Sequence, residues 1–108
     1  MKKLLLILIA LPMIGFGQNV NIPDANFKAY LVGNTLINTS GDNEIQVSEA
    51  NLFGGEIDVE NFNISDLTGI EEFTALTSLD CEENQLTNLD VSQNPALPTS
   101  FVHKQIMN

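Results

Sequence analysis

The chain has 108 residues, enough for one domain, and its 14 acidic residues against four Lys and Arg give a net charge of −10. A balance this acidic disfavours nucleic acid as a partner and suits a cation, a basic protein surface or simple solubility. The single cysteine, Cys81, cannot form a disulfide within the chain, so stability must come from stacking or from a metal.

Residues 1–17 have the pattern of a signal peptide that is removed on export. Two lysines precede an apolar run over residues 4–11, and Gly15 and Gly17 place small residues before the expected cleavage site after Gly17. A membrane anchor is the alternative, but Pro12 interrupts a run that would need roughly 18 apolar residues to span a bilayer. We therefore expect a secreted or cell-surface protein with no membrane span in the mature chain.

Residues 18–55 are predicted to form a helical N-terminal cap. A short helix is predicted over "IPDANFKAYLV", with Pro23 in its first turn and Asp24 at its positive end. Gly33 and Asn34 supply the stop. One face of this helix is expected to be buried, and it carries Phe27, Tyr30 and Leu31.

Residues 38–49, "NTSGDNEIQVSE", follow the spacing of an EF-hand calcium loop between two helical flanks. In such a loop alternate positions offer oxygen ligands, and a glutamate at position twelve closes the site. The predicted calcium ligands are Asn38, Ser40, Asp42, the backbone carbonyl of Glu44, Gln46 and Glu49.

The loop departs from the EF-hand pattern at three positions, because Asn38 replaces aspartate, Ser40 occupies position three and Asn43 replaces glycine. Asparagine tolerates a positive φ, so Asn43 can still make the turn, but fewer carboxylates predict a weak site of the extracellular type. The alternative is a polar hairpin between two cap helices, with Asp42 and Asn43 in the turn and Ser48 as an N-cap.

Residues 56–97 contain a repeated pattern of leucines. The decads "LTSLDCEENQ" and "LTNLDVSQNP" are similar at an offset of ten, and a longer offset relates Ile57 to Leu79 and Val59 to Cys81. The leucine-rich repeat pattern L-x-x-L-x-L-x-x-N/C-x-L is matched by Leu76, Leu79, Cys81, Asn84 and Leu86. The sequence therefore predicts two coils, each with a short parallel strand and an extended return segment.

Such coils cannot bury their apolar faces alone, so they stack into an α/β solenoid whose short parallel strands follow the helical cap. Asn84 is expected to turn the chain and to pair buried backbone groups. The stretch "NISDLTGIEEFTALTSLDCEENQLTNLDVSQN" resembles secreted bacterial leucine-rich repeat proteins of the Bacteroidetes type, and "VNIPDANFKAYLVGN" resembles their N-terminal cap. This resemblance implies an interaction surface without catalytic residues.

Residues 98–108 form a tail that leaves the repeat register at Pro98. Solenoids need about three or more repeats and a terminal cap, so two coils predict the start of a longer, truncated solenoid. The alternatives are a small capped domain or a stacking oligomer. The tail contains the only histidine, His103, with no second residue positioned for a metal site or a catalytic triad.

The outward positions of the predicted sheet are acidic. The longer offset stacks Asp58 beside Asp80 and Glu60 beside Glu82, and these four residues form the expected partner-facing acidic sheet. Like charges opposite one another destabilise a sheet, so they are either solvated or offered to a cation or a basic partner. No aromatic residue is expected on this face, and Cys81 is expected to be a small buried hydrophobe.

The sequence thus predicts a secreted leucine-rich repeat module that binds a protein partner and has no catalytic activity. The alternative is a calcium-binding structural module that uses residues 38–49. A secreted hydrolase would require catalytic groups that the sequence does not offer.

Overall fold

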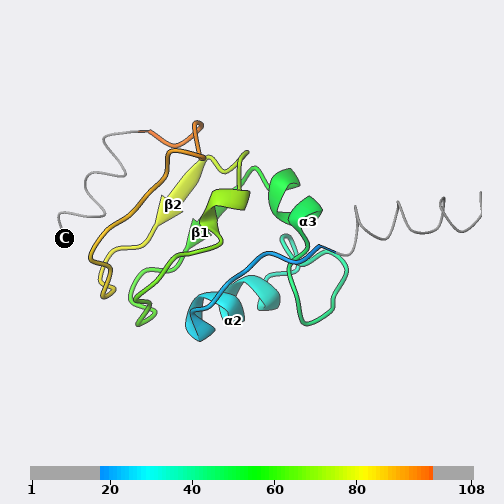
Figure 1. Cartoon of the computed structure of the whole chain (residues 1–108), viewed down its shortest axis with the longest axis horizontal. Coiled ribbons are helices and arrows are strands. Elements are labelled where there is room, and N and C mark those ends of the chain that lie inside the picture. The colour runs from blue at the N-terminus through cyan, green and yellow to red at the C-terminus, as the bar shows by residue number, and fades with distance from the viewer. Residues whose placement is uncertain (1–17, 99–108) are drawn as a thin grey trace, which may run out of the picture.

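The structure is a computed structural model that describes residues 18–98. The predicted signal peptide and residues 99–108 of the predicted tail lie outside the described residues. Helices α2 (Ala25–Gly33) and α3 (Val47–Leu52) come first, followed by strand β1 (Glu56–Asp58), the 3₁₀ helix η1 (Ile70–Glu72) and strand β2 (Ser78–Asp80). Figure 1 shows the two helices at one end and the two coils beside them. No helix within residues 18–98 is long and apolar enough to cross a membrane.

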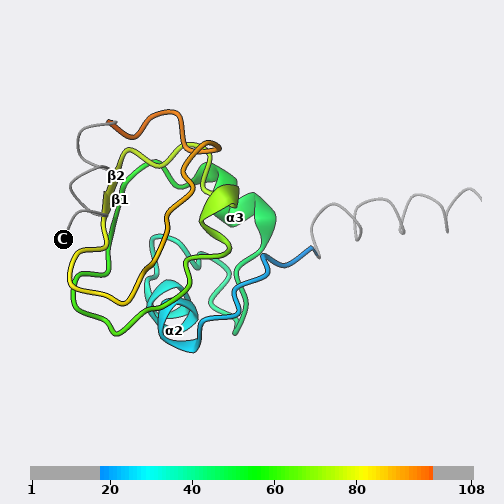
Figure 2. The same ribbon diagram turned by 60° about the vertical axis from the view of Figure 1, so that its left-hand side comes forward.

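The two strands are parallel, with Ile57 opposite Leu79 and Asp58 opposite Asp80. This register is the longer offset predicted from the sequence. Each coil places its strand on one side and its return segment on the other, as Figure 2 shows. The expected extended return holds in the second coil, where residues 86–91 contain no helix, but η1 interrupts the return of the first.

The predicted leucine column forms the core. Ile57 and Leu79 are both 0% exposed, and burial of each such side chain contributes roughly 1.5–3 kcal/mol. Cys81 is buried at the predicted inward position, where burial, with the charges of Asp80 and Glu82, raises the pKa of its thiol to about 12. The thiol therefore stays protonated at neutral pH, as expected of a buried hydrophobe rather than a nucleophile.

Two asparagines pair the backbone groups of neighbouring coils. Asn84 Nδ2 donates to the carbonyl oxygens of Val59 and Cys81 at 2.8 and 3.0 Å, and its Oδ1 accepts from the N–H groups of Phe62 and Ile64 at 3.0 and 2.9 Å. The role predicted for Asn84 is confirmed.

The equivalent residue of the second decad, Asn94, makes the donor half of this pattern on the return side, while its buried Oδ1 has no hydrogen-bond partner among the described residues. Its Nδ2 donates to the carbonyl oxygens of Ile70 and Phe73 at 2.9 and 2.8 Å. The second coil repeats itself at an offset of ten because it has two walls, and each of its walls carries one asparagine.

The cap is joined to the first coil through Asp24. Its Oδ1 accepts from the N–H groups of Asn26 and Phe27 at the start of α2, and its Oδ2 accepts from the N–H of Ser65 at 2.9 Å. Burial alone would raise the pKa of Asp24, but these backbone hydrogen bonds outweigh it and lower the pKa. Asp24 is therefore the N-cap, and the expectation that Pro23 lies in the first turn is wrong because Pro23 precedes the cap.

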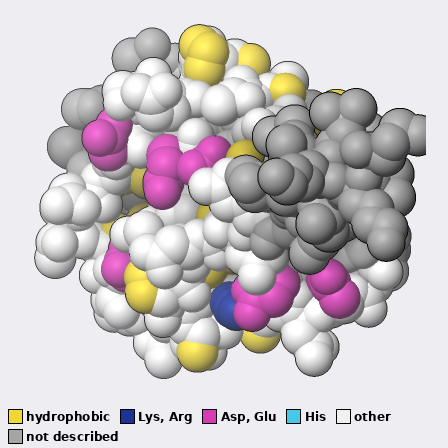
Figure 3. Space-filling model, turned by 45° about the vertical axis from the view of Figure 1, so that its right-hand side comes forward, with side chains coloured by type: hydrophobic (Ala, Val, Ile, Leu, Met, Phe, Trp, Pro, Cys, Tyr) yellow, Lys and Arg dark blue, Asp and Glu magenta, His cyan; other side chains and the backbone are white. Residues whose placement is uncertain are grey.

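Within residues 18–98 the only Lys or Arg is Lys28, on α2. Its Nζ lies 2.9 Å from a carboxylate oxygen of Glu44. In Figure 3 the one dark-blue side chain on the visible face lies against magenta Asp and Glu side chains. The rest of the acidic surface in this part of the chain has no basic side chain to balance it.

Replacing Asn84 with alanine should destabilise the fold. The change removes the Asn84 partner of three carbonyl oxygens and two N–H groups, and each of them that is shielded from water costs roughly 1–3 kcal/mol. We expect the free energy of unfolding to fall by at least about 2 kcal/mol, measured by urea denaturation with circular dichroism. The control is Asn88→Ala, at an exposed position of the same coil. It should change the free energy of unfolding by less than about 0.5 kcal/mol. Equal losses in both variants would contradict the assigned role.

Candidate functional site

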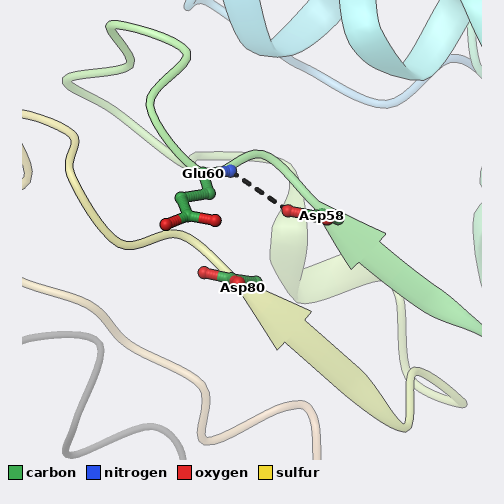
Figure 4. Close-up of side chains that lie close together, drawn as sticks. All are labelled: Asp58, Glu60 and Asp80. Atoms are coloured by element: carbon green, nitrogen blue, oxygen red, sulfur yellow. Dashed lines mark hydrogen bonds between the residues drawn. The ribbon is translucent and has the colours of Figure 1, made fainter.

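The outer face of the sheet gathers three carboxylates. One carboxylate oxygen each from Asp58, Glu60 and Asp80 lies within 4.8 Å of the other two. Asp58 and Asp80 are direct register partners on β1 and β2, and Glu60 comes shortly after the end of β1. Figure 4 shows the side chains of Glu60 and Asp80 pointing toward one another, with Asp58 beside them. The structure thus brings together three of the four residues predicted for the acidic sheet.

Backbone hydrogen bonds orient both aspartates of this cluster. Asp58 Oδ1 accepts from the N–H of Glu60 at 3.3 Å, and Asp80 Oδ1 accepts from the N–H of Glu82 at 3.2 Å. The fourth predicted residue, Glu82, is half-buried and adds its charge to the same face. Repeating one local turn in successive coils therefore places like charges side by side.

The charges of this face act most strongly on Glu60. The negative charge of Asp80 raises the pKa of Glu60, with further contributions from burial and from the charges of Glu82 and Asp58. A raised pKa means that the folded state resists ionisation of this carboxyl group. The face is consequently a source of electrostatic repulsion that a positively charged group could relieve.

Two aromatic side chains lie at the margin of this face nearest the cap. The Tyr30 hydroxyl oxygen, from α2, accepts a hydrogen bond from the N–H of Asp58 at 3.2 Å. The Tyr30 ring meets the Phe62 ring edge to face, with centroids 5.6 Å apart and planes at 84°. Phe62 is 43% exposed. The expectation of a face without aromatic residues is therefore wrong at this margin.

The repeat pattern does not predict this pair, because the two residues come from different parts of the chain. Tyr30 belongs to the cap, far before Asp58 in the chain, and its position predicts only a buried helix face. Phe62 precedes Asn84 by one full coil, in the position where the second coil has its asparagine. A departure from the repeat at that position is the one sequence feature that could have drawn attention to Phe62.

The loop over residues 38–49 joins most of its predicted ligands in one hydrogen-bonded cluster. Ser40 Oγ lies 3.3 Å from Asn38 Oδ1 and 3.1 Å from Gln46 Oε1, and Gln46 Nε2 donates to Asp42 Oδ2 at 3.0 Å. Glu49 closes the cluster, since its Oε2 accepts from the N–H of Ser40 at 2.8 Å. The cluster thus contains two carboxylates and three neutral oxygen donors.

The remaining predicted ligand, Glu44, pairs its side chain with Lys28, which leaves only its backbone carbonyl for the predicted role. Asn38 is 4% exposed, and its Nδ2 donates to the carbonyl oxygens of Val32 and Asp42. That amide is thereby fixed with Oδ1 on the side of Ser40.

Helix α3 begins directly after the loop. Its N-cap is Gln46, whose N–H donates to Glu49 Oε1 at 2.9 Å, so Ser48 is not the N-cap that the hairpin interpretation expected. Burial would raise the pKa of Glu49, but hydrogen bonds from the backbone of Gln46 and Ser40 outweigh it and lower the pKa. Both oxygens of Glu49 therefore accept backbone N–H groups. Oxygen donors suit calcium, but these bonds compete with its bidentate binding.

Comparison with known proteins adds a relationship to the geometry. No family model matches the chain. A stretch of 38 residues is 53% identical to part of Internalin J of Listeria monocytogenes serotype 4b (strain F2365). This stretch covers 35% of this chain and 4% of that protein. The crystal structure of an internalin (inlF) from Listeria monocytogenes str. 4b F2365 has a TM-score of 0.58 and 20% identity, over 70% of this chain and 22% of that chain.

The chain therefore spans only a small share of the length of either relative. Internalins are leucine-rich repeat proteins. The local identity and the shared fold together support a leucine-rich repeat protein.

Proposed function

We propose that the chain is an exported leucine-rich repeat module that binds a protein partner through the outer face of β1 and β2. The observation that carries this proposal is the gathering of Asp58, Glu60 and Asp80 within 4.8 Å. Such a set of like charges lowers stability, and a basic surface on a partner would turn that cost into binding energy. We propose no catalytic role.

The aromatic margin adds to the proposal. Protein interfaces are enriched in aromatic side chains, which contribute large apolar contacts at little cost in conformational entropy. Phe62 is 43% exposed and is held against Tyr30, so it offers an ordered apolar contact beside the charges. A partner with basic residues next to an apolar side chain fits this combination.

Export rests on the pattern of residues 1–17, and the relationship to internalins adds support. The resemblance to secreted Bacteroidetes-type repeat proteins, a solenoid longer than two coils and an out-of-register tail from residue 98 also belong to this proposal. The identity of the partner is not transferred from the relatives.

Neutralising Glu60 should stabilise the free protein. Because the pKa of Glu60 is raised in the folded state, its ionisation opposes folding at neutral pH, and this opposition fades as the pH falls through that pKa. We therefore expect Glu60→Gln to raise the midpoint of thermal unfolding at pH 7. Near pH 3 the midpoint of the variant should equal that of the wild type. The control Glu72→Gln removes one charge from η1. Equal gains from both variants would show that only the net charge matters.

Binding should depend on the three carboxylates of the sheet face. We would select peptides from a displayed random library on the exported wild-type chain and reject those that bind the triple variant Asp58→Asn, Glu60→Gln, Asp80→Asn. The survivors should be rich in Arg and Lys and should bind the triple variant about tenfold or more weakly. They should keep their affinity for a charge-matched control altered at three other carboxylates, Asp66→Asn, Glu71→Gln and Asp90→Asn. Selected peptides without basic residues would count against the proposal. So would peptides whose affinity falls equally for the two triple variants.

A second candidate function is calcium binding by the loop over residues 38–49. It is favoured by the convergence of oxygen atoms from Asn38, Ser40 and Gln46, together with the carboxylates of Asp42 and Glu49. In this second candidate function the loop binds calcium weakly, and the bound ion stabilises the cap.

Calcium should raise the midpoint of thermal unfolding if the loop binds it. A ligand at ten times its Kd adds about 1.4 kcal/mol, which shifts the midpoint of a domain this small by roughly 5–10 °C. We expect this shift between EDTA and millimolar calcium in the wild type, followed by circular dichroism, and no shift in Glu49→Gln. Glu72→Gln should respond as the wild type does. A wild type indifferent to calcium would eliminate this function, and a full response in Glu49→Gln would place the ion elsewhere.

A further inference from the structure

The first described residues are docked on the cap by backbone hydrogen bonds. Residues 18–22 lie along the segment that leads into α3. The N–H of Val20 donates to the carbonyl oxygen of Ile45 at 2.8 Å, and the N–H of Val47 donates to the carbonyl oxygen of Gln18 at 2.9 Å. The residues between these two bonds form an antiparallel bridge. The chain is therefore part of the cap from Gln18 onward.

Side-chain packing fixes the same segment from the side of the first coil. Val20 and Ile22 are 4% and 7% exposed and belong to the core. A Cβ atom on Gly69 would lie 3.0 Å from Ile22 Cγ1 and 3.3 Å from Val20 Cγ1, so the coil approaches the segment as closely as a glycine allows. Loss of residues from this end would first remove the bond from Gln18 to α3 and then uncover the core at Val20.

Gln18 is also the residue that export is expected to leave at the N-terminus. The pattern of residues 1–17 predicts cleavage after Gly17, which turns the backbone nitrogen of Gln18 into an α-amino group. Gln18 is exposed, and the bond that it makes to α3 uses its carbonyl oxygen. This bond therefore involves neither the α-amino group nor the side-chain amide.

We propose that Gln18 is a modification site, at which the exported chain is converted to an N-terminal pyroglutamate. The neutral α-amino nitrogen of Gln18 attacks its own Cδ, and the new C–N bond closes a five-membered lactam. The bond from Cδ to Nε2 breaks, and Nε2 takes a proton from the attacking amine and leaves as ammonia. No oxidant or second reactant is required. Because the step needs an N-terminal Gln18, this inference rests on the export proposed above.

The docked geometry is compatible with this ring. A lactam that includes the nitrogen and Cα restricts rotation about the bond between them, as the ring of proline does. It leaves the carbonyl group of Gln18 unchanged, so the bond to the N–H of Val47 is kept. The ring also removes the free α-amino group that aminopeptidases require. The modification would thus protect a segment whose buried part begins only two residues later, at Val20.

The test measures the mass of the exported protein without digestion, since a glutamine exposed by a protease can cyclise during handling. The full chain, with residues 1–17, is expressed in a bacterium that exports it. The purified product is kept at neutral pH until its mass is constant, and the intact chain is then fragmented in the mass spectrometer. We expect a chain that begins at Gln18 and is lighter than its sequence by about 17 Da, the mass of one ammonia. The fragments should locate this loss at Gln18, because asparagine side chains can also lose ammonia.

The matched control is Gln18→Asn, which keeps an amide and the backbone carbonyl but would have to close a four-membered ring. It should keep its full mass. A wild-type chain that begins at Gln18 with its full mass would overturn this inference and leave export standing. An equal loss in Gln18→Asn, or a loss located at another residue, would overturn it as well. A product that retains residues 1–17 or begins at another residue would overturn both this inference and the cleavage on which it rests.

Discussion

Where each coil turns, backbone N–H and C=O groups have no partner in a strand. The rest of the structure depends on giving these groups hydrogen-bond partners. Short strands pair only a few residues, so most of a coil has no ladder to satisfy its N–H and C=O groups. Asn84 and Asn94 supply those partners from side chains, one on each wall. Because both asparagines donate to backbone carbonyls at the two turns, the leucines between the turns can form a continuous apolar column.

The cap meets the same requirement at the open end of the first coil. Asp24 accepts from N–H groups at the start of α2 and also from the N–H groups of Ser65 and Asp66, so one carboxylate serves two elements. Tyr30 accepts from Asp58 and so covers one N–H on the outer edge of β1. An uncovered strand edge invites pairing with another chain. At Asp58 the cap therefore satisfies the edge of β1 with a side-chain oxygen rather than with a third strand.

The sequence predicted the elements that the repeat and the short-range rules control. The longer repeat offset predicted the register of Asp58 with Asp80, and the EF-hand spacing identified the residues that form the loop cluster. The contact at the sheet face that the sequence did not predict joins distant segments, since Tyr30 of α2 accepts a hydrogen bond from Asp58 of β1. The hairpin interpretation placed the cap at Ser48 rather than at Gln46, two residues earlier, because either residue could start a helix.

The contact between Tyr30 and Asp58 also gives this protein a built-in optical probe. Tyr30 is the only tyrosine of the chain, and the chain has no tryptophan. The tyrosine fluorescence of the protein therefore comes from one ring, at the junction between the cap and the sheet. Emission from an unlabelled sample reports directly on whether α2 stays seated against β1 and Phe62.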